Sequence, residues 1–210
     1  GHALSARMSA GVRFPFLLLL VSGGHCQLLG VGGIDDFRLY GSTIDDAVGE
    51  AFDKAAKILG LPYPGGPAVE AAARTGNSKA FALPRPLVSD HIARPGADFS
   101  FSGLKTALRL LVQQQAPDIA DASASFQAAV IDILTDRTRA AMKMFVADFP
   151  DAAPSVLVVG GGVAANQAIG AALGRLAAGH GFTVRIPPPR LCTDNAAMIA
   201  WAGLVMLAQR

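Results

Sequence analysis

The sequence is poor in charge and in cysteine, and each scarcity excludes a class of protein. Charged residues make up 16% of the 210 residues and hydrophobic residues 51%, which excludes a disordered chain. The two cysteines, Cys26 and Cys192, lie far apart and match no C-x-x-C metal spacing. We therefore expect reduced thiols, as in a cytosolic protein, rather than a disulfide framework.

Long apolar runs are also missing. The longest, residues 14–21 and 196–208, fall short of the roughly 20 residues that a membrane-spanning helix needs. No charged segment precedes a cleavable apolar stretch at the start, so we expect no signal peptide, a cytoplasmic protein and no membrane partner. The net charge of +2 is compatible with an RNA partner without indicating one.

The spacing of hydrophobic residues in the first part predicts strands followed by helices. Two strand-like runs flank the Ser-Gly-Gly turn at residues 22–24, and "FRLYGS" follows them, which predicts an antiparallel meander. A helix is expected to start with a capping box made by Thr43 and Asp46, and to end at Gly60. Pro67 suits the first turn of another short helix.

The rest of the chain predicts long helices and then strand–helix alternation. Helical spacing resumes at Ser102, and a long helix is expected from about Ala116 to Phe149. "SVLVVGGG" then predicts a buried strand, residues 166–179 a helix, "FTVRI" a strand, and "DNAAMIAWAGLVMLAQ" a buried helix. A meander, then helices, then strand–helix–strand–helix suggests one lobe of a larger α/β protein.

Two glycine clusters are candidate anion sites. The glycines after Ser22 form a hairpin tip, where backbone N–H groups can converge on a phosphate. Residues 160–162 are three glycines between a buried strand and a helix that begins near Asn166. This arrangement suits a nucleotide, because free N–H groups and the helix dipole face the ligand. Neither a P-loop nor G-x-G-x-x-G is present, and each cluster also suits a plain turn.

Acidic residues offer two further candidates. Asp46, Glu50 and Asp53 recur at i, i+4 and i+7, so they project from one helical face. Such a ribbon suits ribose hydroxyls, and it equally suits a solvated face paired with neighbouring lysines. Asp194, at the start of the last helix, is either an N-cap or a metal-ligating carboxylate.

Five motifs together resemble one known family. "LLVSGGHCQL", "IDDAVGEAFDKAAKILGLPYPGGP", "DFSFSGLKT", "VVGGGVAAN" and "LCTDNAAMIA" are similar, in order and spacing, to the TsaD family of tRNA N6-adenosine threonylcarbamoyltransferases. The resemblance covers essentially the whole chain, and "DFSFSGLKT" is its most specific part, because no general rule of folding demands it. It implies an actin/Hsp70/sugar-kinase-like (ASKHA) fold, an α/β fold of two lobes with a nucleotide in the cleft.

The resemblance also implies a division of the chain. Residues 1–13 correspond to the end of a metal-binding H-x-E-G-H segment and a linker, and residues 14–210 to the C-terminal lobe. Within this lobe we expect a meander plus helix at 14–60, a mostly helical insertion at 61–150, and nucleotide-binding strand–helix units at 151–210. On this correspondence, the N-terminal lobe is expected to be absent from this chain.

Site residues are implied in the same way. The positions that correspond to substrate contacts are Leu20, Val21, Ser22, Gly23 and Gly24 of the phosphate loop, together with Asp53, Gly66 and Asn166. His2 and Asp194 correspond to two ligands of one divalent metal ion. Iron is the metal that the family implies, while zinc, manganese and magnesium stay open from the donor types. No residue is assigned as a general base.

This sequence departs from the family pattern at three of its motif positions. Cys26 stands where threonine is usual, Ala164 where serine is usual, and Ala196 where glycine is frequent. The first two changes remove hydroxyl groups expected near the nucleotide.

The implied reaction is transfer of a threonylcarbamoyl group from threonylcarbamoyl-AMP to the N6 amine of the adenosine 3′ of the anticodon, in tRNAs reading codons that begin with A. Threonylcarbamoyl-AMP, ATP or AMP would occupy the cleft, and the implied partners are tRNA, an inactive paralogue of the same fold and a small ATPase. Candidate contacts to RNA phosphates are Arg85, Arg94, Lys105, Arg109 and Arg190.

Three alternatives stand beside this acyltransferase. The first is an ATP-dependent kinase or ATPase of the same fold, because fold does not fix function. The second is a catalytically silent paralogue serving as a scaffold, which the retained His2, Asp194 and Asn166 oppose. A metalloprotease ranks below both, because the sequence has no H-E-x-x-H motif.

Overall fold

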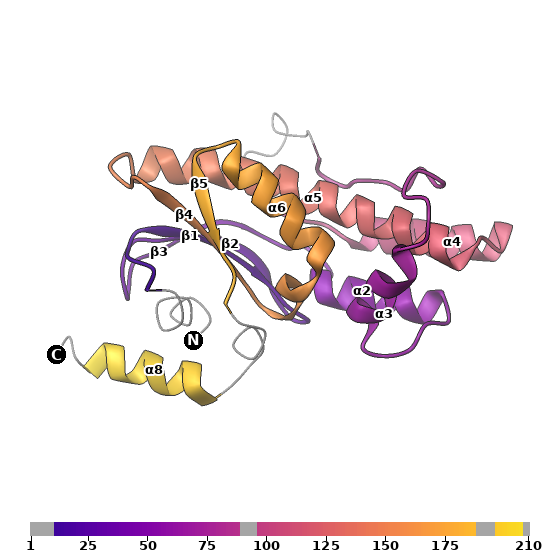
Figure 1. The fold of residues 1–210 in the computed structure, drawn as a ribbon, viewed down its shortest axis with the longest axis horizontal. Helices are drawn as coiled ribbons and strands as arrows, with labels where there is room; N and C mark the ends of the chain where they lie inside the picture. Colours follow the sequence, from indigo (N-terminus) through magenta and orange to yellow (C-terminus); the bar gives the residue numbers. More distant parts are fainter. Residues whose placement is uncertain (1–10, 89–95, 188–195, 208–210) are drawn as a thin grey trace.

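A mixed five-stranded sheet with helices packed on it forms the body of the molecule (Figure 1). The computed structural model describes residues 11–88, 96–187 and 196–207. The strands are β1 (Phe16–Val21), β2 (Cys26–Val31), β3 (Phe37–Ser42), β4 (Ser155–Gly160) and β5 (Phe182–Arg185). The described helices are α2 (Val48–Ile58), α3 (Gly65–Ala73), α4 (Ser102–Gln115), α5 (Ile119–Asp148), the 3₁₀ turn η1 (Gly162–Ala165), α6 (Gln167–Ala178) and α8 (Ala196–Leu207).

The strand order β3-β2-β1-β4-β5 combines two kinds of pairing. β1, β2 and β3 pair antiparallel as consecutive strands, which confirms the predicted meander. β4 and β5 extend the sheet in parallel with β1, and each is reached through a helical crossover. The fold is therefore α/β, with the arrangement expected of one ASKHA-type lobe.

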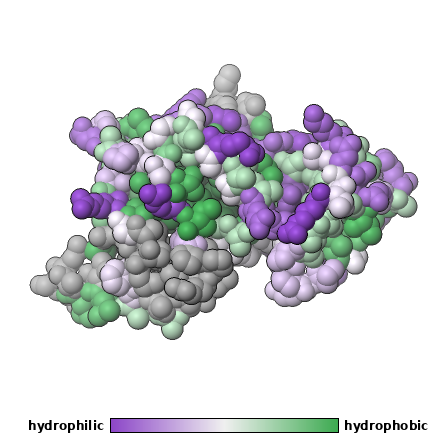
Figure 2. Space-filling model, viewed as in Figure 1, coloured by the Kyte–Doolittle hydropathy of each residue, from purple (hydrophilic) through white to green (hydrophobic). Residues whose placement is uncertain are grey.

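The central strand β1 is buried along its whole length, as a strand covered on both faces must be. Leu17, Leu19 and Val21 point to one face, where they join a large core with α2, α4, α5 and α6. Phe16 and Leu18 point to the other face and join a smaller cluster with Val31 and Val158. Hydrophobic residues gather at the surface over the strands in the left half of Figure 2.

For α2, the end of the helix lies where the sequence predicted it, and the start does not. Gly60, with φ of +70°, follows the last residues of α2 as predicted, because glycine adopts this left-handed conformation without strain. The predicted capping box at Thr43 is wrong: α2 begins at Val48, and the Thr43 hydroxyl donates to the backbone oxygen of Asp46, 2.6 Å away. Thr43 instead stabilises the turn between β3 and α2.

The last helix differs from its prediction in burial. α8 is helical as expected, but the side chains of Ile199, Leu204 and Leu207 are 61%, 62% and 66% exposed. A helix that is apolar on all sides prefers a buried environment, but its sequence does not specify which neighbour provides one. In the ranges that the structure describes, we find no helix with both the length and the apolar character needed to cross a membrane.

Candidate functional site

A pocket of about 450 Å³ opens where the parallel strands β1 and β4 end. In α/β sheets the carboxyl ends of parallel strands are the usual place for ligands, because the loops that follow them diverge. Three parts of the chain form its walls: the β1–β2 turn, α2 with the start of α3, and the η1 turn before α6. The lining residues are Gly23, Gly49, Phe52, Asp53, Tyr63, Pro64, Gly66, Pro67, Glu70, Gly162, Val163, Ala165 and Asn166.

The β1–β2 turn is held by Ser22 and leaves its two glycines open. The Ser22 N–H donates to the His25 carbonyl at 2.8 Å, and the His25 N–H donates to the Ser22 hydroxyl at 3.0 Å. The N–H groups of Gly23 and Gly24 donate to no other described residue, and both glycines are exposed. Free amides at a turn of this kind are suited to an anion such as phosphate.

The η1 turn lies so close to β1 that it requires glycine. Gly161 has φ of +95°, and a Cβ atom there would lie 2.1 Å from the Val21 carbonyl oxygen. No other residue type fits this position without displacing backbone, since the contact is to a main-chain atom. Gly161 thereby brings the Gly162–Ala165 turn against the end of β1 and closes one wall of the pocket.

Asp53, on α2, positions the start of α3. Its Oδ1 atom accepts a hydrogen bond from the Gly65 N–H at 2.9 Å, which fixes the turn that carries Gly66 into the pocket wall. The other carboxylate oxygen, Oδ2, has no hydrogen bond from the described part of the chain. This oxygen is therefore available to accept from a hydroxyl group of a ligand.

Asn166 is 7% exposed and its amide is already engaged. Its Oδ1 atom accepts from the Ile169 N–H at 3.0 Å, so it is the N-cap of α6, and its Nδ2 donates to Gln127 Oε1 at 3.0 Å. Glu70 of α3 accepts from the Gln167 N–H at 2.8 Å and ties α3 to the same helix start. Asn166 therefore shapes the pocket by fixing the first turn of α6.

The substrate contacts that we expected divide into two groups. Gly23, Asp53, Gly66 and Asn166 line the pocket, although they come from four different segments of the sequence. Leu20, Val21, Ser22 and Gly24 do not line it. The first two are buried strand residues, 8% and 0% exposed, while Ser22 and Gly24 belong to the turn that carries Gly23.

The carboxylate ribbon that we considered on α2 does not form. Asp46 precedes the helix and pairs with Lys54 and Lys105, and Glu50 pairs with Lys54. Only Asp53 of the three faces the pocket. The ribbon depended on helical spacing from Asp46 onward, and α2 starts two residues later.

Two of the departures from the family pattern are not among the residues that line the pocket. Cys26 is fully buried at the start of β2, and this burial raises the pKa of its thiol above the ordinary value. Ala164 is 5% exposed and packs into the core. Neither residue lines the pocket in this structure.

The expected metal ligands, His2 and Asp194, lie outside the described residues. Residues 188–195, which directly precede Ala196, are also outside them. Within the described ranges no group of three or more His, Cys, Asp or Glu side chains gathers in a way that would hold a metal ion. The metal site stays a prediction.

The candidate RNA contacts have mixed environments. Arg85 forms an ion pair with Asp132 at 2.9 Å, and Lys105 forms one with Asp46 at 2.8 Å. Arg109 is exposed on α4, and Arg94 and Arg190 lie outside the described residues. Two of these cations thus already have partners in the chain.

Only four of the lining residues were expected from the sequence as substrate contacts, and Gly49, Tyr63 and Glu70 are among those that were not. Gly49 and Tyr63 belong to the stretch around α2, and Glu70 follows the Gly-Gly-Pro turn. Glu70 lies one helical turn beyond Gly66 in α3, which places both on the same face of that helix. This spacing is the signal that would have identified it.

The sheet and the pocket at its parallel strand ends define an α/β lobe of the ASKHA class. Comparison with known proteins identifies the family: the chain belongs to the TsaD family, whose model, described as tRNA N6-adenosine threonylcarbamoyltransferase, matches residues 1–201.

Relatives from Brucella anthropi and Brucella ovis, both named tRNA N6-adenosine threonylcarbamoyltransferase, are each 59% identical over 207 residues. A relative of the same name from Brucella abortus is 58% identical over 207 residues. These alignments cover 97% of this chain and 56% of each relative, so the chain spans little more than half the length of its relatives. The crystal structure of T. kodakarensis HypF matches with a TM-score of 0.49 and 16% identity, covering 83% of this chain and 21% of that one.

Proposed function

We propose that the full-length protein carrying this chain transfers a threonylcarbamoyl group from threonylcarbamoyl-AMP to the N6 amine of the adenosine 3′ of the anticodon, in tRNAs that read codons beginning with A. The observation that carries the proposal is the convergence of Gly23, Asp53, Gly66 and Asn166 on one pocket at the ends of β1 and β4. These residues belong to motifs of a family described by this activity.

In this proposal the pocket holds the adenylate half of the donor. The open N–H groups of Gly23 and Gly24 bind its phosphate, since backbone amides at a turn favour an anion. The free Oδ2 atom of Asp53 accepts from a ribose hydroxyl, and Phe52 provides an apolar floor for the ligand. Phe52 is held in place by an edge-on contact with Phe126, with 5.5 Å between ring centroids.

The chemistry of the transfer follows from a donor held in this way. The N6 nitrogen attacks the carbamoyl carbon and forms the new bond, the bond from that carbon to the phosphate oxygen breaks, AMP leaves, and one N6 proton passes to solvent. The Gly23 and Gly24 amides stabilise the negative charge that grows on the leaving phosphate. The target adenosine lies in a single-stranded loop, where an unstacked base is accessible to a protein.

A divalent metal ion belongs to the proposal through His2 and Asp194. Imidazole and carboxylate donors suit iron, zinc or manganese, with magnesium favoured less by the histidine. When bound, the ion would supply Lewis-acid neutralisation of phosphate charge.

The proposed partners are tRNA as acceptor, an inactive paralogue of the same fold and a small ATPase, with the reaction in the cytoplasm where mature tRNA is used. The family resemblance supports these partners. The kinase or ATPase, scaffold and protease alternatives are not favoured by the family to which the chain belongs.

The test is transfer of labelled threonine into tRNA by the full-length protein, supplied with the enzymes that make and support threonylcarbamoyl-AMP. Asp53→Asn keeps an acceptor for the Gly65 N–H but loses the carboxylate, so we expect the transfer rate to fall about ten- to a hundredfold. Asp151→Asn, at an exposed position before β4 and so at the other end of that strand from the pocket, is the matched control and should retain the wild-type rate.

Other outcomes would separate the alternatives. ATP turnover without tRNA, and without label in tRNA, would favour the kinase or ATPase. Neither label nor ATP turnover would favour the scaffold. Equal transfer by wild type and Asp53→Asn would remove Asp53 from the site.

A further inference from the structure

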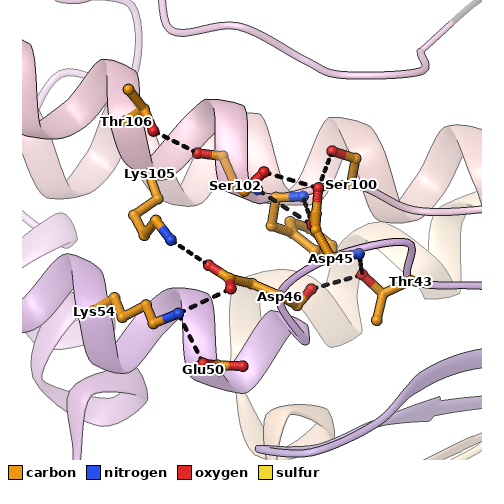
Figure 3. Close-up of polar contacts among 10 residues, drawn as sticks. Thr43, Asp45, Asp46, Glu50, Lys54, Ser100, Ser102, Lys105 and Thr106 are labelled. Atoms are coloured by element: carbon orange, nitrogen blue, oxygen red, sulfur yellow. Dashed lines mark hydrogen bonds and ion pairs between the residues drawn. The ribbon is translucent and has the colours of Figure 1, made fainter.

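One motif is not explained by the pocket. "DFSFSGLKT", residues 98–106, is the most specific part of the family resemblance, yet none of its residues lines the pocket. The structure places its first half along the connection between β3 and α2 (Figure 3). Phe99 pairs with Thr43 in an isolated parallel bridge, and the Phe99 N–H donates to the Ser42 carbonyl at 3.0 Å.

Asp45, in that connection, caps helix α4 from outside the helix. α4 has no side-chain cap of its own, since Phe101 occupies the N-cap position. The Asp45 carboxylate accepts from the Phe101 N–H at 2.8 Å and the Ser102 N–H at 3.3 Å. It also accepts from the hydroxyl groups of Ser100 at 2.5 Å and Ser102 at 2.9 Å. Four hydrogen bonds thus join this carboxylate to the start of α4.

Asp46 joins the same connection to two helices at once. Its carboxylate receives Lys54 Nζ of α2 and Lys105 Nζ of α4, each at 2.8 Å (Figure 3). The Asp46 side chain is only 15% exposed, and Lys105 is 27% exposed, so this ion pair is shielded more than a surface pair. We call Asp45, Asp46, Ser100, Ser102 and Lys105 the clasp.

The clasp lies directly before the part of α2 that forms the pocket wall. The Gly49 N–H, in the first turn of α2, donates to the Ser22 carbonyl at 3.1 Å. A Cβ atom at Gly49 would lie 2.7 Å from that carbonyl oxygen and 2.8 Å from the Gly23 nitrogen. The start of α2 therefore touches the phosphate-binding turn, and a shift of the helix changes the turn.

We propose that Asp45, Asp46 and Lys105 are positioning residues, which hold the start of α2 and the Gly23–Gly24 turn in the geometry that binds the adenylate phosphate. They act through Gly49 and touch no part of the ligand. The identity of the ligand rests on the proposed function, whereas the mechanical link from α4 to the turn does not. The clasp gives the "DFSFSGLKT" motif a role in the site from outside the pocket.

The test uses full-length protein with Lys105→Met, which removes the charge and keeps most of the side chain. Two quantities are measured: the dissociation constant for AMP, and amide hydrogen exchange without ligand in peptides covering residues 20–26 and 47–54. We expect AMP to bind about three- to tenfold more weakly, because mutations that loosen such a link change coupling by this order. Exchange should rise in both peptides.

Three further variants make the result specific. Lys105→Arg keeps the charge and should restore wild-type affinity and exchange. Lys143→Met makes the same substitution at an exposed lysine on α5 and should leave both quantities unchanged. Asp46→Asn weakens the clasp from its other side and should reproduce Lys105→Met, with thermal unfolding confirming that each variant is folded.

The outcomes are distinguishable. The proposal is overturned if Lys105→Met lowers the unfolding temperature but keeps wild-type AMP affinity and wild-type exchange at residues 20–26. The clasp would then contribute to stability alone. If wild type binds no AMP but Lys105→Met still raises exchange at both peptides, the clasp is supported and the proposed function fails.

Discussion

At the scale of single residues, the pocket depends on backbone contacts that tolerate no added atom. Gly161 combines φ of +95° with a backbone so close to β1 that a Cβ atom would lie 2.1 Å from the Val21 carbonyl oxygen. Gly174, inside α6, has a helical backbone and no atom of another element within 4 Å of where a Cβ atom would stand. The two glycines therefore differ sharply in what an alanine would cost.

Gly161→Ala should lower the free energy of unfolding by about 2–4 kcal/mol, since it combines a strained φ with a main-chain clash. Gly174→Ala should raise it by about 0.5–1 kcal/mol, because alanine stabilises a helix interior relative to glycine. Urea denaturation of both variants measures the difference. Equal effects of the two substitutions would contradict the close packing of η1 against β1.

Asp45 makes the stability of the protein depend on pH. Partial desolvation of its carboxylate opposes ionisation, but the hydrogen bonds from Phe101, Ser100 and Ser102 outweigh it and hold the pKa of Asp45 below its ordinary value. Because the pKa is lower in the folded state, this stabilisation is present above about pH 4 and is lost as the pH falls through the folded-state pKa.

We expect wild type to lose more unfolding free energy between about pH 6 and pH 3 than Asp45→Asn does, since the asparagine cannot titrate. At neutral pH, Asp45→Asn should be less stable than wild type by about 1–2 kcal/mol, because the amide nitrogen cannot accept from the Ser100 and Ser102 hydroxyl groups and the charge is lost. Urea titrations at the two pH values give both numbers. Parallel pH profiles for wild type and Asp45→Asn would show that the cap does not control acid stability.

At the scale of secondary-structure elements, the helices differ in where their caps come from. α5 and α6 are capped by their own preceding residues, Asp118 and Asn166, whereas α4 is capped from the β3–α2 connection by Asp45. Only a cap that comes from the residue directly before the helix can be recognised in a local stretch of sequence. The cap of α4 comes from a residue more than fifty positions away, so no local pattern in the sequence indicates it.

Asn166→Ala and Asp118→Ala should each lower the free energy of unfolding by about 1–2 kcal/mol, because each removes an N-cap. Only Asn166→Ala should also weaken AMP binding, since the first turn of α6 forms a wall of the pocket and that of α5 does not. Calorimetric titration of AMP into both full-length variants compares them. Equal affinities would mean that the cap of α6 contributes stability alone.

The strands, the two glycine turns and the glycine that ends α2 were predictable from the sequence, because each depends on neighbouring residues. Contacts between distant segments were not. The Glu70 contact with the Gln167 N–H spans 97 positions, and it depends on the fold that brings Glu70 to the start of α6. The exposure of α8 was not predicted either, because the burial of a helix depends on which other element packs against it.

At the scale of the whole molecule, one lobe assembles the pocket from segments spread between the β1–β2 turn and the start of α6. Gly23 and Asn166 lie far apart in the sequence, and the parallel pairing of β1 with β4 brings their loops together. This chain covers 56% of the length of its Brucella anthropi relative. Under the proposed function, this lobe binds the adenylate half of the substrate.

The most direct test is amide hydrogen exchange of the full-length protein with and without AMP. We expect slower exchange on AMP binding in four segments, namely residues 20–26, 47–54, 64–70 and 160–167, because these form the walls of the pocket. Peptides from the middle of α5 should not change. The assignment of this pocket as the adenylate site would be contradicted if saturating AMP gave no protection in these segments, or protected only other parts of the chain.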